Sequence, residues 1–444
     1  MIKFHAIGGF NEVGKNMSIL EIDDDAFIFD MGLYMPPIVE LENEKGIYSE
    51  KKLREINALP QDKNISSDLR KKIRAILIGH AHLDHVGAVP YMEHNYNAQI
   101  VGTPFTIEFL RTLAKDGNFI LKNRTRAVSP NSRLIIKGNQ DIEVEFVNIT
   151  HSTLQTAIIV VHTSKGAVVY ANDFKFDNTP VLGKKPNYAR LKELAREGVL
   201  ALIVDSLYAD TERKTPSEKI ARGLLEDVLL TTNNENAGIF VTTFSSHMAR
   251  LKSIVDCGKI LGRRILFLGR SLHRYFSVAS KLNLIPFVHD VRVFTYRKQV
   301  ERILKKVAKK RTKYLVVCTG HQGEPGSVLD RLTRGVLPYR FSSKDHVIFS
   351  SCVIPTVWNI TNRQKIEKKL KEYGVRIFTD VHISGHASRE DLRDFIEMLQ
   401  PEHIVPAHGG LDKTTPFAEL ASELGYKLGS NLHLMQNGAT IQFD

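Results

Sequence analysis

The stretch Gly79-His80-Ala81-His82-Leu83-Asp84-His85 gathers three imidazoles and one carboxylate in a single turn. It follows the apolar run Ala75-Ile76-Leu77-Ile78, which is typical of a buried strand. The first two histidines are two positions apart, so an extended backbone points both side chains to the same side. The aspartate and the last histidine can face a second centre. Imidazole and carboxylate together suit zinc, manganese and similar divalent ions. A polar loop with chance histidines is the alternative, but four candidate ligands at one strand end favour a metal site.

Two later strand ends repeat this pattern. The predicted strand 144–149 runs into His151, and the predicted strand 167–170 is followed by Asp173. Either residue alone would more often be an ordinary turn residue. Together with the first cluster they are interpreted as metal ligands, because strand ends distant in sequence can converge at one edge of a sandwich. Asp30 ends the predicted strand 26–29, and we expect its carboxylate to orient a ligand histidine.

Composition narrows the class of protein. The 444 residues are enough for two to three domains. Lys and Arg exceed Asp and Glu by 61 − 49 = 12, which favours a polyanionic partner such as nucleic acid, although general solubility also accounts for excess charge. Three cysteines without a paired spacing indicate a reducing, cytoplasmic compartment. No apolar run approaches ~18 residues, so we expect neither export nor a membrane span.

The pattern of predicted elements changes after the predicted strand 200–204, which ends at Asp205. Helical and strand patterns alternate from residue 217 to residue 349, as in a parallel sheet with flanking helices. Loops at these strand ends, such as 243–247, carry hydroxyl and glycine residues that suit phosphate binding, although helix N-caps use the same residue types. The predicted helix 296–310 is very basic. A solvated face and a surface that follows a nucleic-acid backbone both remain open for it.

The residues quoted so far resemble the β-CASP nucleases of the metallo-β-lactamase superfamily, and within them the RNase J family in its archaeal form. The pattern His-x-His-x-Asp-His is typical of the superfamily, whereas the run His382-Ile383-Ser384-Gly385-His386-Ala387-Ser388 is close to diagnostic for the family. Gly79 stands where bacterial members usually have threonine, and this departure changes no ligand. Further matching segments are 8–16, 173–177, 205–206, 269–271, 322–325 and 408–410.

This resemblance implies an α/β fold with two domains. Residues 1–205 and 381–444 would form a metallo-β-lactamase αββα sandwich. Residues 206–380 would form an inserted β-CASP domain, a parallel sheet with flanking helices. The polar segment 35–72 is interpreted as an insertion or long loop beside the site rather than as a domain.

The resemblance also implies a set of site residues. One zinc would be held by His80, His82 and His151, a second by Asp84, His85 and His408, and Asp173 would bridge them. This gives two Zn²⁺ per chain, with Mn²⁺ or Mg²⁺ able to support activity. Two such ions would activate a water and neutralise charge on the reacting phosphate, with Asp84 counted among the catalytic residues.

Two further groups of residues follow from the family. Asp205 would hold His386, which would stabilise charge on the phosphate or protonate the leaving 3′ oxygen. Contacts to the RNA phosphates would come from Ser245, Ser246, His247, His382, Ile383, Ser384, Gly385, His386, Ala387 and Ser388.

The function implied is a zinc-dependent 5′→3′ exoribonuclease in RNA processing and decay. It would act on single-stranded RNA from a 5′-monophosphate end, with endonuclease activity as a second capacity, as a cytoplasmic homodimer. One alternative is a β-CASP endoribonuclease of the cleavage and polyadenylation factor type. A small-molecule metallo-hydrolase would need neither the inserted βα segment nor the excess of positive charge. A non-catalytic RNA-binding member is disfavoured because the ligand residues are intact.

Overall fold

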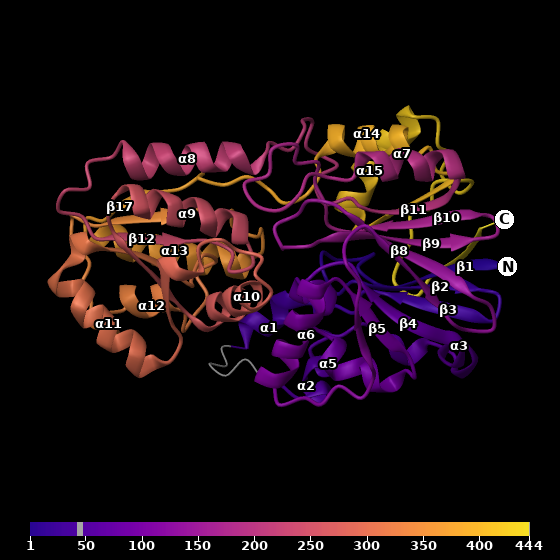
Figure 1. Cartoon of the computed structure of the whole chain (residues 1–444), viewed down its shortest axis with the longest axis horizontal. Coiled ribbons are helices and arrows are strands. Elements are labelled where there is room, and N and C mark those ends of the chain that lie inside the picture. The colour runs from indigo at the N-terminus through magenta and orange to yellow at the C-terminus, as the bar shows by residue number, and fades with distance from the viewer. Residues whose placement is uncertain (42–47, 444) are drawn as a thin grey trace.

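The computed structural model describes residues 1–41 and 48–443, and three sheets organise it (Figure 1). The first sheet has the strand order β19-β1-β2-β3-β4-β5-β6. Its pairings are antiparallel from β19 to β3 and parallel from β3 to β6. The strands are β1 (Ile2–Gly8), β2 (Met17–Ile22), β3 (Asp25–Phe29), β4 (Ile73–Ile78), β5 (Gln99–Gly102), β6 (Thr125–Ala127) and β19 (Thr440–Phe443).

The second sheet has the order β18-β11-β10-β9-β8-β7. It is antiparallel from β7 to β10 and parallel from β10 to β18. The inner strand β11 is buried along its whole length, which explains its continuous apolar run. The strands are β7 (Ser132–Ile136), β8 (Ile142–Asn148), β9 (Ala157–Thr163), β10 (Gly166–Ala171), β11 (Val199–Asp205) and β18 (His403–Ala407).

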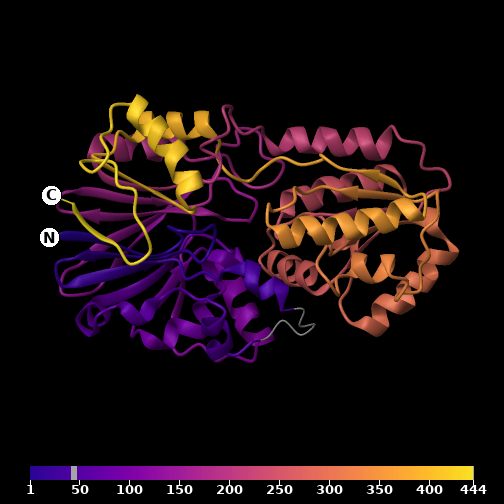
Figure 2. The same cartoon turned by 180° about the vertical axis from the view of Figure 1, so that it is seen from behind.

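These two sheets pack face to face and are covered by helices on their outer faces, which confirms the predicted αββα sandwich. The shared core includes the stacked rings of Phe29 and Tyr170, whose centroids are 4.7 Å apart. Helices from the first half cover the first sheet, and α7, α14 and α15 cover the second, as Figure 2 shows from behind. The helices are α1 (Met35–Glu40), α2 (Glu50–Glu55), α3 (Ser67–Lys72), α4 (Leu83–Val86), α5 (Val89–Met92), α6 (Pro104–Asp116), α7 (Tyr188–Glu197), α14 (Arg389–Leu399) and α15 (Leu411–Glu423).

The third sheet lies beside the sandwich and is parallel throughout, in the order β14-β13-β15-β12-β16-β17. Helices α8, α9 and α10 pack on one face, and α11, α12 and α13 on the other. The strands are β12 (Ile239–Thr242), β13 (Arg264–Leu268), β14 (Val291–Phe294), β15 (Tyr314–Cys318), β16 (His346–Phe349) and β17 (Arg376–Phe378). The helices are α8 (Glu218–Leu230), α9 (Met248–Ile260), α10 (Arg270–Lys281), α11 (Arg297–Lys309), α12 (Val328–Thr333) and α13 (Val357–Glu372).

The predicted alternation is present, and the segment 35–72 holds only short helices in its described residues, with 42–47 outside them. Two longer helices, α7 and α13, were not predicted. The face that α13 buries carries Asn359 and Arg363 beside Ile366 and Leu370, so the apolar period is interrupted. The guanidinium of Arg363 lies 3.2 Å from the ring centroid of Phe349, a contact that lets a cation occupy a buried position.

A buried ion pair holds the junction between the sandwich and the third sheet. The side chain of Arg250 on α9 is fully buried, and its Nε and Nη2 donate to the Glu218 carboxylate at 2.5 and 2.9 Å. Its Nη1 also donates to the carbonyl oxygens of Ser350 and Val381, at 3.0 and 3.3 Å. One guanidinium therefore connects α8, α9, the end of β16 and the segment that returns to the sandwich.

Removing Arg250 should destabilise the protein strongly, because Glu218 would remain as an uncompensated buried charge. We expect Arg250→Met to lower the free energy of unfolding by about 3–5 kcal/mol in chemical denaturation. The control is Arg222→Met on α8, which removes part-exposed ion pairs with Glu226 and Asp256 and should cost no more than about 1 kcal/mol. Equal effects of the two variants would contradict the role given to the buried pair.

The same pair predicts a pH dependence of stability. Burial alone would raise the pKa of the Glu218 carboxyl, but His247 and Arg250 beside it hold the pKa well below its ordinary 4.5. The stabilisation that a lowered pKa gives the folded state is fully present above the pKa of the unfolded chain. It is lost as the pH falls toward the pKa of the folded state. We therefore expect the free energy of unfolding to fall less between pH 7 and about pH 4 in Glu218→Gln than in the wild type.

Candidate metal and catalytic centre

The candidate ligands stand after the carboxyl ends of strands that share one edge of the sandwich. The cluster 80–85 follows β4, His151 follows β8, Asp173 follows β10 and His408 follows β18. Asp173 and His408 have φ angles of 63° and 61°, the left-handed region that non-glycine residues avoid. Such strained positions turn the chain sharply at the strand end and are common at functional sites.

The first group of ligand atoms converges on one point. His82 Nδ1 lies 3.1 Å from both His80 Nε2 and His151 Nε2. Asp173 Oδ2 is 3.4 Å from His80 Nε2 and 3.7 Å from His151 Nε2. Nitrogens that share one tetrahedral zinc at about 2.0–2.1 Å lie about 3.3 Å apart, so this group fits a zinc ion.

A second group adjoins the first and shares its carboxylate. His85 Nε2 lies 3.2 Å from Asp173 Oδ2, and His408 Nε2 lies 3.6 Å from Asp173 Oδ1. Asp84 Oδ2 is 3.7 Å from His85 Nε2 and 3.9 Å from His408 Nε2. Because Asp173 belongs to both groups, it is placed where a carboxylate would bridge two ions.

The hydrogen bonding of Asp173 and the protonation state of His80 also fit a bound cation. Asp173 is 2% exposed, and its Oδ1 has no hydrogen-bond partner in the described part of the chain. A buried carboxylate oxygen without a partner is costly, and a metal ion would compensate it. Burial and the neighbouring His85 lower the pKa of His80 to about 4, so this imidazole is neutral and can donate its lone pair.

Hydrogen bonds to the outer ring nitrogens orient most of these ligands. His85 Nδ1 lies 2.8 Å from Asp30 Oδ2, which also accepts from the Tyr170 hydroxyl at 2.8 Å. His408 Nδ1 lies 3.1 Å from Asn16 Oδ1, and His151 Nδ1 lies 2.7 Å from the carbonyl oxygen of Gly385. Asn16 and Tyr170 were not among the predicted site residues. The glycine-rich turn before Asn16 was the available signal, but nothing in the sequence ties Tyr170 to Asp30.

A histidine–aspartate pair faces the same space. His386 Nδ1 lies 2.7 Å from Asp205 Oδ2, and Asp205 Oδ1 accepts from the backbone N–H of Leu207 at 2.9 Å. The His386 ring is 5.0 Å from that of His151, so it stands beside the ligand groups. Although burial opposes the charged form, Asp205 and Asp173 raise the pKa of His386 to about 9. The imidazole is therefore protonated at neutral pH and can act as an acid.

Comparison with known proteins agrees with this geometry. Residues 11–211 match the metallo-β-lactamase superfamily, residues 236–370 the Ribonuclease J β-CASP domain, and residues 367–428 a Zn-dependent metallo-hydrolase RNA specificity domain. Ribonuclease J of Methanocaldococcus jannaschii is 41% identical over 99% of this chain and 98% of its own length. Ribonuclease J of Pyrococcus abyssi is 42% identical over 100% of this chain and 97% of its own.

The chain belongs to the Ribonuclease J family. It is a metal-dependent ribonuclease, as predicted, and the small-molecule alternative is set aside. Ribonuclease J2 of Bacillus subtilis is a more distant relative, 27% identical over 100% of this chain and 75% of its own length. A crystal structure of a protein of unknown function from Enterococcus faecalis has a TM-score of 0.64 and 15% identity, with 99% of each chain covered, and supports the fold. Among the described residues we find no helix with the length and apolar character of a membrane span.

The loop 245–247, which was predicted to contact RNA, also makes contacts within the protein. Ser246 Oγ lies 3.0 Å from His82 Nε2, so a residue of the inserted domain contacts a ligand histidine. Ser245 Oγ contacts Ser271 Oγ at 2.8 Å. His247 is 3% exposed, accepts from the backbone N–H of Arg250 and lies beside Glu218. RNA contacts by these three residues stay predictions.

Several residues of the return segment 382–388 make hydrogen bonds within the protein. His382 Nδ1 lies 3.3 Å from Arg250 Nη1, and the Ile383 carbonyl accepts from the same guanidinium. The N–H of Ala387 donates to the carbonyl of Phe174, and the N–H of His386 donates to Ser384 Oγ. Ser388 caps α14. The backbone N–H groups of His382, Ile383, Ser384 and Gly385 have no hydrogen-bond partner within residues 1–41 and 48–443.

Proposed function

We propose that this Ribonuclease J releases nucleotides from the 5′ end of single-stranded RNA, and that a 5′-monophosphate is held by the return segment. The observation that supports the proposal is the place of the last two of these four unpaired N–H groups, those of Ser384 and Gly385. Ser384 and Gly385 directly precede His386, and the Gly385 carbonyl contacts the ligand His151. Unpaired backbone N–H groups are suited to phosphate oxygens. A phosphate bound here would lie beside the centre that hydrolyses the RNA.

Close packing favours glycine at position 385. A Cβ atom built on Gly385 would lie 3.0 Å from His151 Nδ1 and 3.1 Å from its Cε1. Any side chain would therefore press against the ring of a predicted metal ligand. The absence of a side chain brings the backbone of the return segment against the centre and keeps the N–H groups accessible.

The geometry of the centre supports a role for each site residue. We assign one ion to His80, His82 and His151 and another to Asp84, His85 and His408, with Asp173 shared and zinc as the expected metal. When bound, two divalent ions activate a water and neutralise phosphate charge. Asp205 accepts from His386 Nδ1 and so directs the Nε2 proton toward the centre. That proton would pass to the 3′ oxygen of the departing nucleotide.

We also propose a cytoplasmic homodimer. Three apolar side chains, one just before α13 and two in its first turn, support self-association, because Ile354, Val357 and Ile360 are 42%, 83% and 40% exposed. An exposed apolar surface of this kind often marks an interface. Sedimentation velocity should therefore find a mass near twice the 50.1 kDa of one chain, and a monomer would contradict the proposal.

Loss of His386 should affect catalysis without emptying the metal centre. We expect His386→Ala to lower kcat by roughly 10²–10⁴-fold, because the leaving oxygen would lack its acid, while the metal content of the purified protein stays at the wild-type value. The matched control is His289→Ala, which removes an exposed histidine of the inserted domain and should leave kcat unchanged. Loss of metal from His386→Ala would reassign this residue to the ligand groups.

The direction of cleavage tests the proposed function itself. RNA carrying a 5′-terminal label should release the label as a mononucleotide from the first turnover, and monophosphorylated RNA should react faster than triphosphorylated RNA. The reason is that the two N–H groups donate to the oxygens of one compact phosphate, and a triphosphate adds bulk and charge. Labelled 5′ fragments longer than one nucleotide, formed at a rate that does not depend on the 5′ group, would show an endonuclease and overturn the proposal.

A further inference from the structure

Helix α11 and the turn after it concentrate positive charge on one exposed surface. Its apolar side, which includes Ile303 and Val307, is buried against the third sheet. Its acidic residue, Glu301, pairs with Arg297 at 2.9 Å. In the described part of the chain, seven exposed cations here lack any ion pair, and we call them the α11 basic surface: Lys298, Arg302, Lys305, Lys306, Lys309, Lys310 and Lys313.

This arrangement works against the stability of the helix. Lys298 and Arg302, and likewise Lys305 and Lys309, are four residues apart, where like charges repel. Arg297 and Lys298 occupy the first turn, which contains no acidic residue, although the helix dipole favours negative charge there. The dipole accounts only for cations of the last turn, such as Lys309. Helix stability therefore does not explain the charge pattern.

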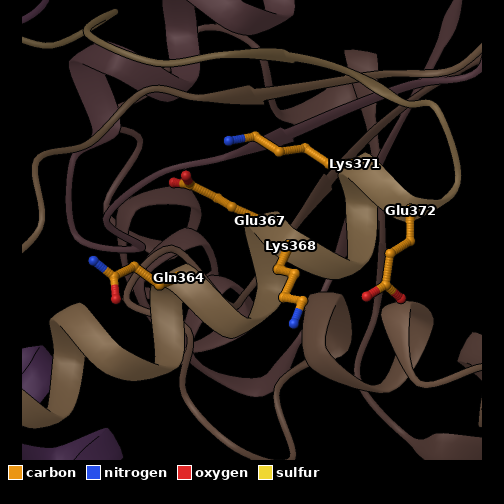
Figure 3. A pocket seen from close by; sticks show the side chains of 5 residues that line it. All are labelled: Gln364, Glu367, Lys368, Lys371 and Glu372. Atoms are coloured by element: carbon orange, nitrogen blue, oxygen red, sulfur yellow. The ribbon is translucent and has the colours of Figure 1, made fainter.

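Helix α13, on the same side of the third sheet, carries acidic residues among its cations. Lys368 and Lys371 share its exposed surface with Glu367 and Glu372, and Figure 3 shows these side chains around a shallow pocket. Lys369 Nζ also contacts Glu372 Oε2 at 2.9 Å. Two glutamates lie among the five cations of α13, whereas α11 has one glutamate among six cations, so the excess of positive charge is larger on α11.

An aromatic ring adjoins the α11 basic surface. Tyr296 immediately precedes the helix, and its side chain is 73% exposed. A positive surface next to an exposed aromatic ring is the combination that binds single-stranded nucleic acid, since phosphates contact the cations and a base stacks on the ring. A membrane surface fits less well, because the apolar side of α11 is buried and cannot enter lipid.

We propose that the α11 basic surface binds the body of the RNA substrate, downstream of the nucleotides at the metal centre. The helix lies at the end of the third sheet that is remote from the sandwich in both views (Figures 1 and 2), so short RNA held at the centre would not contact it. The inference rests on the proposed function, because it takes RNA as the ligand. It adds a second binding surface that would hold a long substrate between successive cleavages.

The test compares RNA lengths in a charge-reversal variant. Arg302→Glu, Lys305→Glu and Lys309→Glu are combined, and the control combines Lys365→Glu, Lys368→Glu and Lys371→Glu on α13, which changes the net charge equally. For monophosphorylated RNA of about 40 nucleotides, the α11 variant should lose about tenfold or more in kcat/KM, and the slope of log kcat/KM against log salt should decrease by about 2. RNA of about 6 nucleotides should react as with the wild type. The α13 control should behave as the wild type on both.

Binding measured by fluorescence anisotropy separates this inference from the proposed function. If the wild type binds long RNA without releasing 5′ nucleotides, the proposed function fails, and the affinity of the α11 variant still decides the inference. Tyr296→Ala should weaken binding of long RNA about fivefold, and Tyr296→Phe should restore it. Wild-type affinity of the α11 variant for long RNA, or an equal loss in the α13 control, would overturn the inference. Loss of binding to phosphatidylserine vesicles but not to RNA would overturn it in favour of a membrane.

Discussion

The buried carboxylate of Asp173 is the constraint on which the centre depends. A carboxylate at 2% exposure is costly unless it is compensated. Burial would raise its pKa, but His408, His85 and His386 around it hold the pKa well below its ordinary value. These three histidines come from two regions of the sandwich and from the return segment. The strand ends must therefore meet at one edge before the charge of Asp173 is tolerated, and two metal ions would complete the compensation.

The inserted domain is part of this centre rather than an appendage to it. Ser246 contacts the outer nitrogen of His82, and the hydroxyl of Tyr275 donates to the carbonyl of Ala81 at 2.9 Å. The loop that carries the first ligands is thus held from the side of the third sheet. Arg250 fixes the junction from which the return segment brings Gly385 and His386 to the ligand groups. The position of the inserted domain and the geometry of the centre are accordingly coupled.

The features that could be predicted from the sequence are those that local residue patterns determine. The cluster 80–85 could be predicted because its ligands lie within one turn after one strand, and the α/β class followed from the alternation of periods. Helix α13 was missed because Asn359 and Arg363 interrupt its buried face. Contacts such as Ser246 with His82 depend on how two domains pack, which no local pattern contains. The burial of His247 beside Glu218 likewise arises only in the folded chain.

We propose that the Asp173 carboxylate is shared between two metal ions. Anomalous diffraction near the zinc absorption edge, from crystals of the zinc-loaded protein, tests it most directly. We expect two peaks about 3.5–4 Å apart, one among His80, His82 and His151 and the other among Asp84, His85 and His408, with Asp173 between them. A single peak under saturating zinc, or two peaks that do not share Asp173, would contradict the account.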